Sequence, residues 1–214
     1  MSKDVEMVMC FETDHLVCRL SAHDERGFFP VHHEILPVIL EGKSVWFAAR
    51  WTVEQRGDFR QVIPYVVIAH GRDVVTYRRA RTGEEERLHD LLSIGAGGHV
   101  NLVDAHASTG YNINVQRAMV TAVNRELREE LGFVRSPKNV QREDWLGIIL
   151  DDSDEVSQCH FGVILLIRLL RRVELSPAKE LEDCRYTPIG ELLNQTEEME
   201  NWSRLCVGAV RDAL

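Results

Sequence analysis

The fold is decided by the stretch that begins S-I-G-A-G-G-H-V-N-L-V-D at residues 93–104 and ends N-R-E-L-R-E-E-L-G-F at residues 124–133. In the second part, Glu126, Glu129 and Glu130 stand at i, i+3 and i+4, which places three carboxylates on one face of a helix. A second row with the same spacing is apolar and predicts the buried face, formed by Val120, Val123, Leu127 and Leu131. Gly132 predicts the helix end, because glycine is the usual residue just after the last turn.

Three carboxylates on one helical face need something to offset their repulsion. Two unit charges about 4 Å apart repel by roughly 4 kcal/mol at an effective dielectric near 20. Either one acid takes up a proton, or a hard divalent cation such as Mg²⁺ or Mn²⁺ binds, since carboxylate and carbonyl oxygens are its preferred ligands. Gly97 and Gly98 favour the cation, because glycine lets the backbone bring a carbonyl to a metal or an amide to a phosphate.

An acidic helix face alone is usually solvated surface, so the glycine turn and the helix have to be taken together. Together they resemble the Nudix box, which runs Gly, five residues, Glu, seven residues, then Arg-Glu-aliphatic-any-Glu-Glu-any-Gly-aliphatic. The second half of the box matches from Arg125 to Phe133, with Phe133 as the last apolar position. In the first half, Gly98 is followed after five residues by Asp104, which is one methylene shorter than the family's glutamate.

The chain departs from the box between its two halves. Twenty residues, 105–124, stand where the family has seven, so thirteen are extra. We expect this insertion to form a loop before the helix, because H-A-S-T-G-Y-N-I-N (106–114) is typical of a loop, with Asn112 or Asn114 capping the helix. The metal-binding half is untouched. Whether Asp104 still reaches Arg125, as the resemblance implies, is left open, and a longer loop would instead shape the mouth of the site.

The resemblance implies an α+β Nudix fold, in which a mixed β-sheet is sandwiched between α-helices. A wider pattern is similar to a bacterial subgroup described as MutT-like predicted phosphoesterases, and it includes R-Q-V-I-P-Y, Y-R-R, E-R-L-H and the delayed box helix. This likeness covers most of the chain, whereas the box spans only residues 98–133. We interpret residues 1–214 as a single Nudix domain, with residues 1–60 as an N-terminal extension and residues 61–214 as the core.

The resemblance also implies a divalent-metal-dependent hydrolase that cleaves a pyrophosphate bond in a nucleoside diphosphate linked to another moiety. The expected ligands of Mg²⁺ or Mn²⁺ are Glu126, Glu129, Glu130 and the carbonyl of Gly98. Glu129 and Glu130 are also expected to be catalytic, with Arg125 pointing away from the metals and orienting the helix. Bound metal would activate a water molecule and neutralise the diphosphate. The base, sugar and leaving group of the substrate do not follow from these residues.

Candidate substrate contacts lie on both sides of the glycine turn. Arg78 and Arg79 end an expected strand, with Arg81 close behind, and the planar guanidinium fits phosphate geometry. The alternative is a solvated edge strand that arginines keep soluble. His99 directly follows Gly98, so it either touches a phosphate or orients the glycine loop.

The general base of Nudix hydrolases often comes from a loop outside the box. The candidates are four acids of the loop D-D-S-D-E at residues 151–155: Asp151, Asp152, Asp154 and Glu155. Glu130 itself is another candidate. A run of acids is more often a solvated turn, and this alternative stays open.

Composition restricts the class of protein. The 214 residues carry 25 basic and 34 acidic side chains, so the formal charge is 25 − 34 = −9, which argues against binding to duplex nucleic acid. No apolar run approaches the roughly 20 residues that span a bilayer, and the start M-S-K-D-V-E lacks the features of a signal peptide. We expect a cytoplasmic protein that does not bind membranes. Five cysteines without C-x-x-C spacing indicate neither a disulfide framework nor a zinc site.

Hydrophobic runs predict the remaining elements. Short strands are expected at Val5–Phe11 and Leu16–Leu20, and residues 1–60 either add strands to the main sheet or form a dimer surface. Gln61–Ala69 and Val74–Arg79 predict a hairpin. Further strands are expected at Trp145–Leu150 and Cys159–Leu170. Residues 199–214 predict an amphipathic helix whose inward side chains are Trp202, Leu205, Val210 and Leu214.

Two alternatives to the hydrolase are left open. A catalytically silent Nudix-fold module that binds a nucleotide or a protein is suggested by the insertion and by the altered first half of the box. Such modules generally lose box glutamates, and here all three remain. An enzyme similar to isopentenyl-diphosphate isomerase would need a cysteine near the site, a role open to Cys159. Many Nudix proteins are homodimers, but no residue pattern decides the oligomeric state.

Overall fold

The computed structural model describes residues 6–14, 27–30, 35–41, 45–82, 86–109 and 114–214. The strand predicted at Leu16–Leu20 and the candidate cap Asn112 lie outside the described residues. The elements in chain order are β1 (Met7–Glu12), β2 (Gly27–Pro30), α2 (Ile35–Leu40), β3 (Val45–Ala49), α3 (Arg50–Glu54), β4 (Phe59–His70), β5 (Asp73–Arg79), η2 (Glu86–Leu88), β6 (Leu92–Ser93), β7 (Gly95–Gly97), α4 (Leu102–Thr109), α5 (Val115–Leu131), β8 (Val140–Leu150), α6 (Glu155–Gln158), β9 (His160–Leu169), β10 (Leu181–Pro188), α7 (Ile189–Leu192), η3 (Thr196–Glu198) and α8 (Asn201–Ala213).

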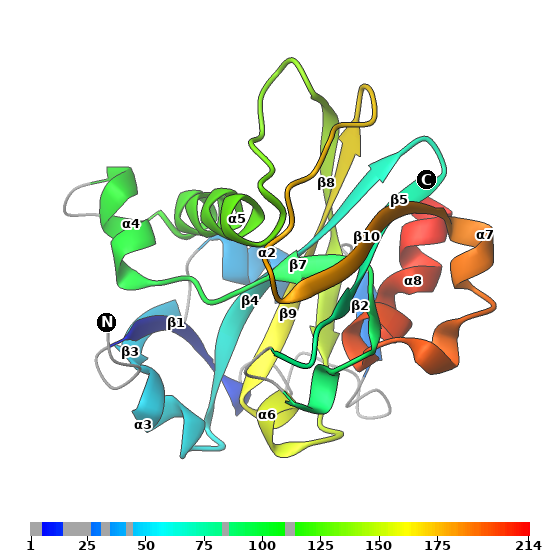
Figure 1. The fold of residues 1–214 in the computed structure, drawn as a ribbon. Helices are drawn as coiled ribbons and strands as arrows, with labels where there is room; N and C mark the ends of the chain where they lie inside the picture. Colours follow the sequence, from blue (N-terminus) through cyan, green and yellow to red (C-terminus); the bar gives the residue numbers. More distant parts are fainter. Residues whose placement is uncertain (1–5, 15–26, 31–34, 42–44, 83–85, 110–113) are drawn as a thin grey trace. The chain divides into compact units, whose positions relative to one another are not determined.

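The strands hydrogen-bond in the order β10-β5-β4-β9-β8-β2, with β1 on β3 and β4, β6 on β5, and β7 on β4 (Figure 1). The predicted α+β class is confirmed. None of the helices in the described residues has the length and hydrophobicity that crossing a membrane requires.

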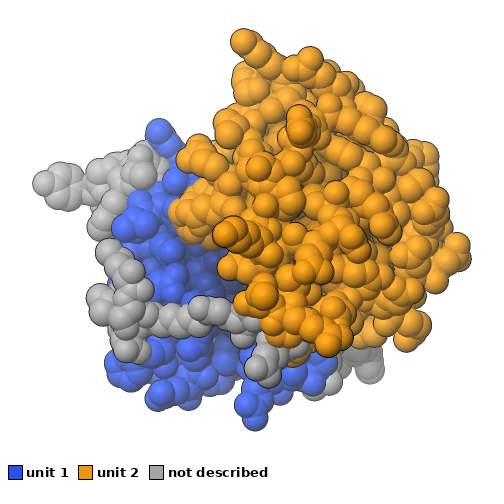
Figure 2. Space-filling model, viewed as in Figure 1, with its two compact units in different colours: residues 1–64, 98–123, 147–163 blue, residues 65–97, 124–146, 164–214 orange. Residues whose placement is uncertain are grey.

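The chain forms two compact units (Figure 2). Unit 1 consists of residues 1–64, 98–123 and 147–163, and unit 2 consists of residues 65–97, 124–146 and 164–214. Strands β4, β8 and β9 contribute residues to both units. The interpretation of the whole chain as a single Nudix domain remains a prediction.

The N-terminal strands of unit 1 join its sheet. Strand β1 pairs antiparallel with β3 along its length and with the start of β4, where Cys10 lies opposite Gln61. The Met9 amide also donates to the Val100 carbonyl at 2.8 Å, so β1 holds the segment that follows the glycine turn. The N-terminal extension therefore adds strands to the sheet, which is one of its two predicted roles.

Unit 2 is built on the predicted hairpin. Strands β4 and β5 pair antiparallel, with Ala69 opposite Val74, and Gly71 turns the chain at a φ of 59°. Strand β10 covers the other edge of β5, with a register shift between Glu182 and Arg185. The short strands β6 and β7 pair with β5 and β4 and lead into the glycine turn.

Helix α5 carries the box acids, and its ends agree with the sequence. The Asn114 side chain accepts from the Arg117 amide at 2.9 Å, so Asn114 is the N-cap, as predicted. Gly132 has a φ of 61°, and its amide donates to the Arg128 carbonyl at 3.2 Å, which is the expected glycine-terminated end. A Cβ at this position would lie 2.8 Å from Ser176. The buried side chains of the helix are Val115, Ala118, Met119, Ala122, Val123, Leu127 and Leu131.

The loop predicted at residues 106–114 is wrong for residues 106–109, which belong to helix α4. Residues 110–113 lie outside the described residues, and Asn114 caps α5 as predicted. Residues 115–124 form the first turns of α5, where the apolar spacing of V-Q-R-A-M-V-T-A-V-N buries Val115, Met119 and Val123. Half of the stretch 105–124 therefore lengthens the box helix at its N-terminus.

The inward face of α8 also differs from the prediction. Its buried residues are Ser203, Cys206, Val207 and Val210, of which only Val210 was predicted. Trp202 is half-buried, with its ring edge-on to Tyr65 at 5.8 Å between centroids. The helix therefore turns one polar side chain inward, and this serine belongs to a hydrogen-bond network around Glu200.

Candidate active site

The three box glutamates differ in exposure. The Glu126 and Glu130 side chains are only 15% and 17% exposed, whereas Glu129 is 61% exposed. Arg79, at the end of β5, donates to Glu130 Oε1 at 3.2 Å. The other oxygen, Oε2, is buried and has no hydrogen-bond partner. A buried carboxylate oxygen without a donor is uncommon in folded proteins and indicates a position built for a ligand.

The environment of Glu130 raises its pKa from 4.5 to about 7. The largest cause is burial, which disfavours the charged form. Arg79 opposes this shift, and the charges of Glu126 and Glu200 add to it. Glu130 thus titrates near neutral pH without a metal, and a bound cation would favour its ionised form.

Arg125 lies against the acids rather than pointing away from them. Its Nη1 is 2.5 Å from Glu126 Oε1 and 3.6 Å from Glu129 Oε2. Both contacts are made within the helix, the second between residues four apart. The guanidinium partly neutralises two of the three carboxylates and fixes their direction.

The glycine turn begins in β7 of unit 2. Gly95, Ala96 and Gly97 pair with Val67, Val66 and Tyr65 of β4. A Cβ on Gly95 would lie 2.2 Å from the Tyr65 ring, so only glycine fits there. Gly98, the proposed carbonyl ligand, belongs to unit 1. Its role as a ligand therefore stays a prediction from the box.

Asp104 caps helix α4. Its Oδ2 accepts from the Asn101 amide at 2.9 Å, while the Asp104 amide donates to the Asn101 carbonyl at 2.9 Å. An acid that accepts from the amide three residues before it, at the start of a helix, makes one of the two contacts of a capping box, while the Asn101 side-chain oxygen does not make the other. Asp104 is buried and belongs to unit 1, so the acid in the first half of the Nudix box has a structural role there. Its predicted contact with Arg125 stays untested.

Of the predicted arginines, only Arg79 contacts a box acid among the described residues. Arg78 donates to the Asp90 carbonyl at 2.6 Å and pairs with Glu198. Arg81 forks onto the Asp90 carboxylate at 2.6 and 2.9 Å. Asp90 itself has a φ of 63°, so these two arginines support a strained turn. Their binding to substrate remains a prediction.

His99 pairs with His160 in unit 1. Their Nε2 atoms are 3.2 Å apart, and His160 Nδ1 is 2.6 Å from the Val156 carbonyl. Because a carbonyl only accepts, Nδ1 of His160 carries a hydrogen, and neutral His160 then accepts from His99 through Nε2. The geometry supports the orienting role proposed for His99, and contact with a phosphate stays untested.

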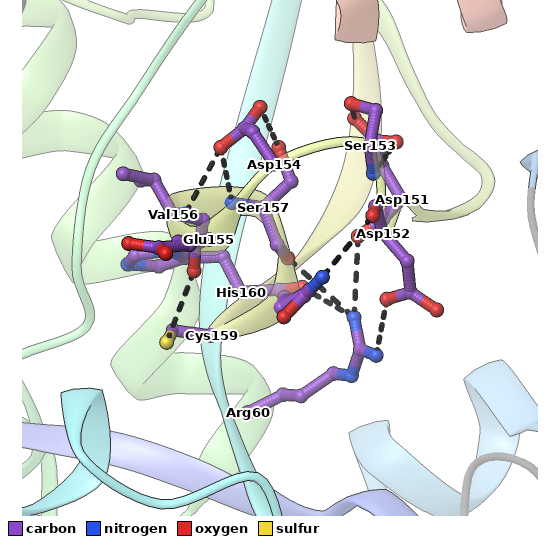
Figure 3. A network of polar contacts seen from close by, with 11 residues as sticks. Arg60, Asp151, Asp152, Ser153, Asp154, Glu155, Val156, Ser157, Cys159 and His160 are labelled. Carbon is purple, nitrogen blue, oxygen red and sulfur yellow. Dashed lines mark hydrogen bonds and ion pairs between the residues drawn. The ribbon is translucent and has the colours of Figure 1, made fainter.

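The acidic loop is held by its own carboxylates (Figure 3). Asp154 is the N-cap of α6 and accepts from the Val156 and Ser157 amides at 2.9 Å. Asp152 accepts from Arg60 Nη2 at 2.5 Å. These two predicted general bases therefore have structural partners. Glu155 is exposed.

Sequence reasoning missed Arg60. Its side chain is 7% exposed, and Nη1 lies within 3.4 Å of three carbonyls, those of Asp151, Ser157 and His160 (Figure 3). The position of Arg60 at the start of a strongly apolar strand could have indicated this role, because a buried arginine needs hydrogen-bond acceptors. Arg60 fixes the acidic loop to β4 within unit 1.

Cys159 is poorly suited to nucleophilic chemistry. Its Sγ lies 3.4 and 3.5 Å from the carbonyls of Glu155 and Glu54. Burial raises the thiol pKa, and Glu54 adds to this effect. A catalytic cysteine needs a lowered pKa, so the environment argues against an isomerase-like role.

The box acids have the chemistry of a divalent-metal site but are not preassembled around an ion. Among the described residues, no three His, Cys, Asp or Glu side chains are grouped so that they could hold a metal. The partnerless, buried Oε2 of Glu130 and the carboxylate donor set fit Mg²⁺ or Mn²⁺.

Comparison with known proteins identifies the family, although no family model matches the chain. YmaB of Bacillus subtilis (strain 168) is 33% identical over 162 residues, which cover 74% of each chain. Tm1382, a protein described as a candidate Nudix hydrolase, is 25% identical, with a TM-score of 0.75 over 98% of this chain and all of that one.

More distant structures share the fold. The Nudix domain of NrtR from Shewanella oneidensis, solved with ADP ribose, is 11% identical, with a TM-score of 0.52 over 72% of this chain and 88% of that one. A Nudix hydrolase from Alicyclobacillus acidocaldarius is 14% identical, with a TM-score of 0.52 over 72% of this chain and 91% of that one. These more distant structures show the fold alone. Together with the box helix, the likenesses to YmaB and Tm1382 show that the chain belongs to the Nudix hydrolase superfamily, and they confirm the predicted class of enzyme, a phosphoanhydride hydrolase.

Proposed function

We propose that this protein is a divalent-metal-dependent hydrolase that cleaves the pyrophosphate bond of a nucleoside diphosphate linked to another moiety. The observation that carries the proposal is Glu130, a buried carboxyl on the box helix with one oxygen on Arg79 and one without a partner. A purely structural acid would have both oxygens bonded. Here one oxygen is left for a group that the protein does not supply.

The residues proposed to hold Mg²⁺ or Mn²⁺ are Glu126, Glu129 and Glu130, with the carbonyl of Gly98. When bound, the metal would lower the pKa of a water molecule and neutralise the diphosphate. Arg79 keeps Glu130 in place by a charged hydrogen bond from the end of β5. Arg125 holds the direction of Glu126 and Glu129 from the same helix.

Substrate contacts are proposed at Arg79 and His99, and Arg78 is a weaker candidate. Arg79 is the strongest of the three, because it already lies at a box acid and has a planar fork that matches phosphate. Arg78 is held by Asp90 and Glu198, so binding a substrate would require it to leave one of them.

The general base is proposed among Glu130 and Glu155. Asp154 caps a helix and Asp152 pairs with Arg60, and proton transfer by either would disturb a structural contact. A base works best when its pKa lies near the working pH, and the raised pKa of Glu130, about 7, meets this condition. Glu155 has the advantage of exposure.

Hydrolysis by variants tests the proposal. A panel of ADP-ribose, nucleotide sugars, dinucleoside polyphosphates and nucleoside triphosphates is assayed with Mg²⁺ and with Mn²⁺, and the products are identified. Glu130→Gln and Glu129→Gln are expected to lower turnover on the best substrate by about a thousandfold, equivalent to roughly 4 kcal/mol of transition-state stabilisation. Glu180→Gln, an exposed acid of unit 2, is the matched control. Wild-type rates in both box variants at saturating metal would refute the proposal.

A silent binding module is the second candidate, and the contact of Arg125 with two box acids favours it. In such a module the guanidinium would permanently take the place of the metal. Calorimetric titration with Mn²⁺ separates the two functions. The hydrolase is expected to bind the ion at millimolar concentration or below, whereas no heat of binding there would favour the silent module.

A further inference from the structure

A second buried carboxyl, Glu200, lies in unit 2 outside the Nudix box. It directly precedes α8 and is 8% exposed. Three hydroxyl groups converge on its Oε1, those of Tyr65, Ser93 at 2.7 Å and Ser203 at 2.9 Å. Ser203 Oγ also accepts from the Ile94 amide at 2.9 Å, which orients the serine toward the acid.

This arrangement supplies hydrogen-bond donors to a carboxylate. A carboxylate accepts several hydrogen bonds on one oxygen, and hydroxyl donors bind an anion more strongly than a neutral acid. The first residues of α8 add the positive end of a thirteen-residue helix. Among the described residues, no Lys, Arg or His forms an ion pair with Glu200, so hydroxyl groups rather than a cation solvate its charge.

The hydroxyl network connects Glu200 with the box helix. Ser93 Oγ, which donates its one hydrogen to Glu200, lies 3.0 Å from the Gly95 carbonyl, and Tyr77 donates to that carbonyl at 2.7 Å. The Arg79 guanidinium lies 5.7 Å from the centre of the Tyr77 ring and donates to Glu130. All of these residues belong to unit 2.

Electrostatics agree with this path. Burial is the largest cause of the raised pKa of Glu130 and of Tyr77, and the charge of Glu200 adds to both shifts, as the charge of Glu130 does for Tyr77. A buried carboxylate is repelled by a second one nearby, and a glutamine could accept the same hydrogen bonds without that repulsion. A carboxylate at this position is therefore unfavourable unless a cation binds nearby and is attracted by its negative charge.

We propose that Glu200 is a positioning residue for the metal site, whose buried negative charge strengthens divalent-cation binding at Glu126, Glu129 and Glu130 without ligating the ion. This inference rests on the proposed function, because it requires that the box acids bind a metal. It adds a residue from the start of the last helix to a site otherwise defined by the box.

The test is calorimetric titration of substrate-free protein with Mn²⁺. Glu200→Gln removes the charge and keeps the shape, and we expect it to weaken binding by about threefold to tenfold, the size of a buried charge acting over several ångströms. Ser203→Ala and Tyr65→Phe each remove one hydroxyl but keep the charge, so binding should stay within about twofold of the wild-type value. Glu198→Gln is the control for net charge, because Glu198 is an exposed acid close by in the sequence.

The variants separate charge from hydrogen bonding. Glu200→Asp keeps the charge and shortens the side chain, and we expect near-wild-type affinity for Mn²⁺. Circular dichroism checks that each variant folds. Glu200→Met, also neutral and of similar length, replaces Glu200→Gln if the latter does not fold.

Each failure has its own meaning. Wild-type affinity in the neutral variants overturns the role of Glu200 and leaves the metal site standing, and so does equal weakening in Glu200→Asp and Glu200→Gln. No binding of Mn²⁺ to the wild-type protein at millimolar concentration overturns the metal-dependent function together with this inference.

Discussion

The acidic loop of unit 1 and the box acids of unit 2 are two groups of carboxylates that differ in their hydrogen-bond partners. In the loop, Asp152 accepts from Arg60, and Asp154 accepts from two backbone amides. On the helix, Glu130 has one donor, Arg79, and one buried oxygen without a partner. Its pKa is raised to about 7.

This difference separates acids that hold the fold from acids that are kept for a ligand. A carboxylate with full hydrogen bonding stabilises its surroundings and gains little from a metal. A buried carboxylate that lacks donors destabilises the protein until a cation or a proton arrives. Removing a loop acid or its partner should therefore lower stability, whereas removing Glu130 should lower activity and relieve the fold.

The largest effect on stability is expected at Arg60. Arg60→Met leaves Asp152 without its cation and three carbonyls without their donor. Removing one partner of a mostly buried ion pair is expected to lower the free energy of unfolding by about 3 kcal/mol. Urea denaturation followed by circular dichroism measures the change.

Arg56→Met is the matched control for Arg60. Arg56 pairs with Asp58 in the same unit, but both side chains are about half exposed. Exposed ion pairs contribute little because water and salt screen them, so this variant should change the unfolding curve far less. Equal losses in the two arginine variants would show that Arg60 does not hold the acidic loop in the way described.

Glu130 should show the opposite behaviour as the pH changes. Its folded-state pKa of about 7 lies above the value near 4.5 expected in the unfolded chain. The folded state therefore holds the proton more tightly, and this contribution to stability is complete below pH 4.5 and is lost as the pH rises to 7. The loss is about 3 kcal/mol, from roughly 1.4 kcal/mol for each of about 2.5 pKa units.

The measurement compares wild type with Glu130→Gln in metal-free buffer. The difference in free energy of unfolding, variant minus wild type, should increase between pH 4.5 and 7 and stay constant above pH 7. Other titrating groups cancel in the difference between the two proteins. A difference that does not vary with pH would mean that Glu130 is not buried in its charged form, and the contrast with the acidic loop would fail.

Local patterns account for what the sequence predicted of the box helix. The acids and the apolar row follow from spacing along one helix, and Asn114 and Gly132 act within a few residues of its ends. Residues 106–109 were misjudged because the Ser, Thr, Gly and Asn residues of the stretch 106–114 resemble a loop. The apolar spacing of Val115, Met119 and Val123 agrees with the helix start that Asn114 marks.

Tertiary contacts account for what sequence reasoning missed. Tyr65, Ser93 and Ser203 meet at Glu200 although more than a hundred residues separate the first from the last. No periodicity links such positions, and an acid just before a helix is usually read as a solvated cap residue. The network becomes visible only when α8, β4 and β6 are placed together.

The smallest effect is expected at Asp154, where the acidic loop relies on one cap. Asp154→Ala removes the acceptor for the Val156 and Ser157 amides and for the Ser157 hydroxyl, and should lower the free energy of unfolding by about 1 kcal/mol. Glu155→Ala, next in sequence and exposed, should leave stability unchanged. Thermal denaturation of both variants measures the difference. If the two variants were equally stable, Asp154 would not stabilise the fold, and it would belong, like Glu130, to the acids that are kept for a ligand.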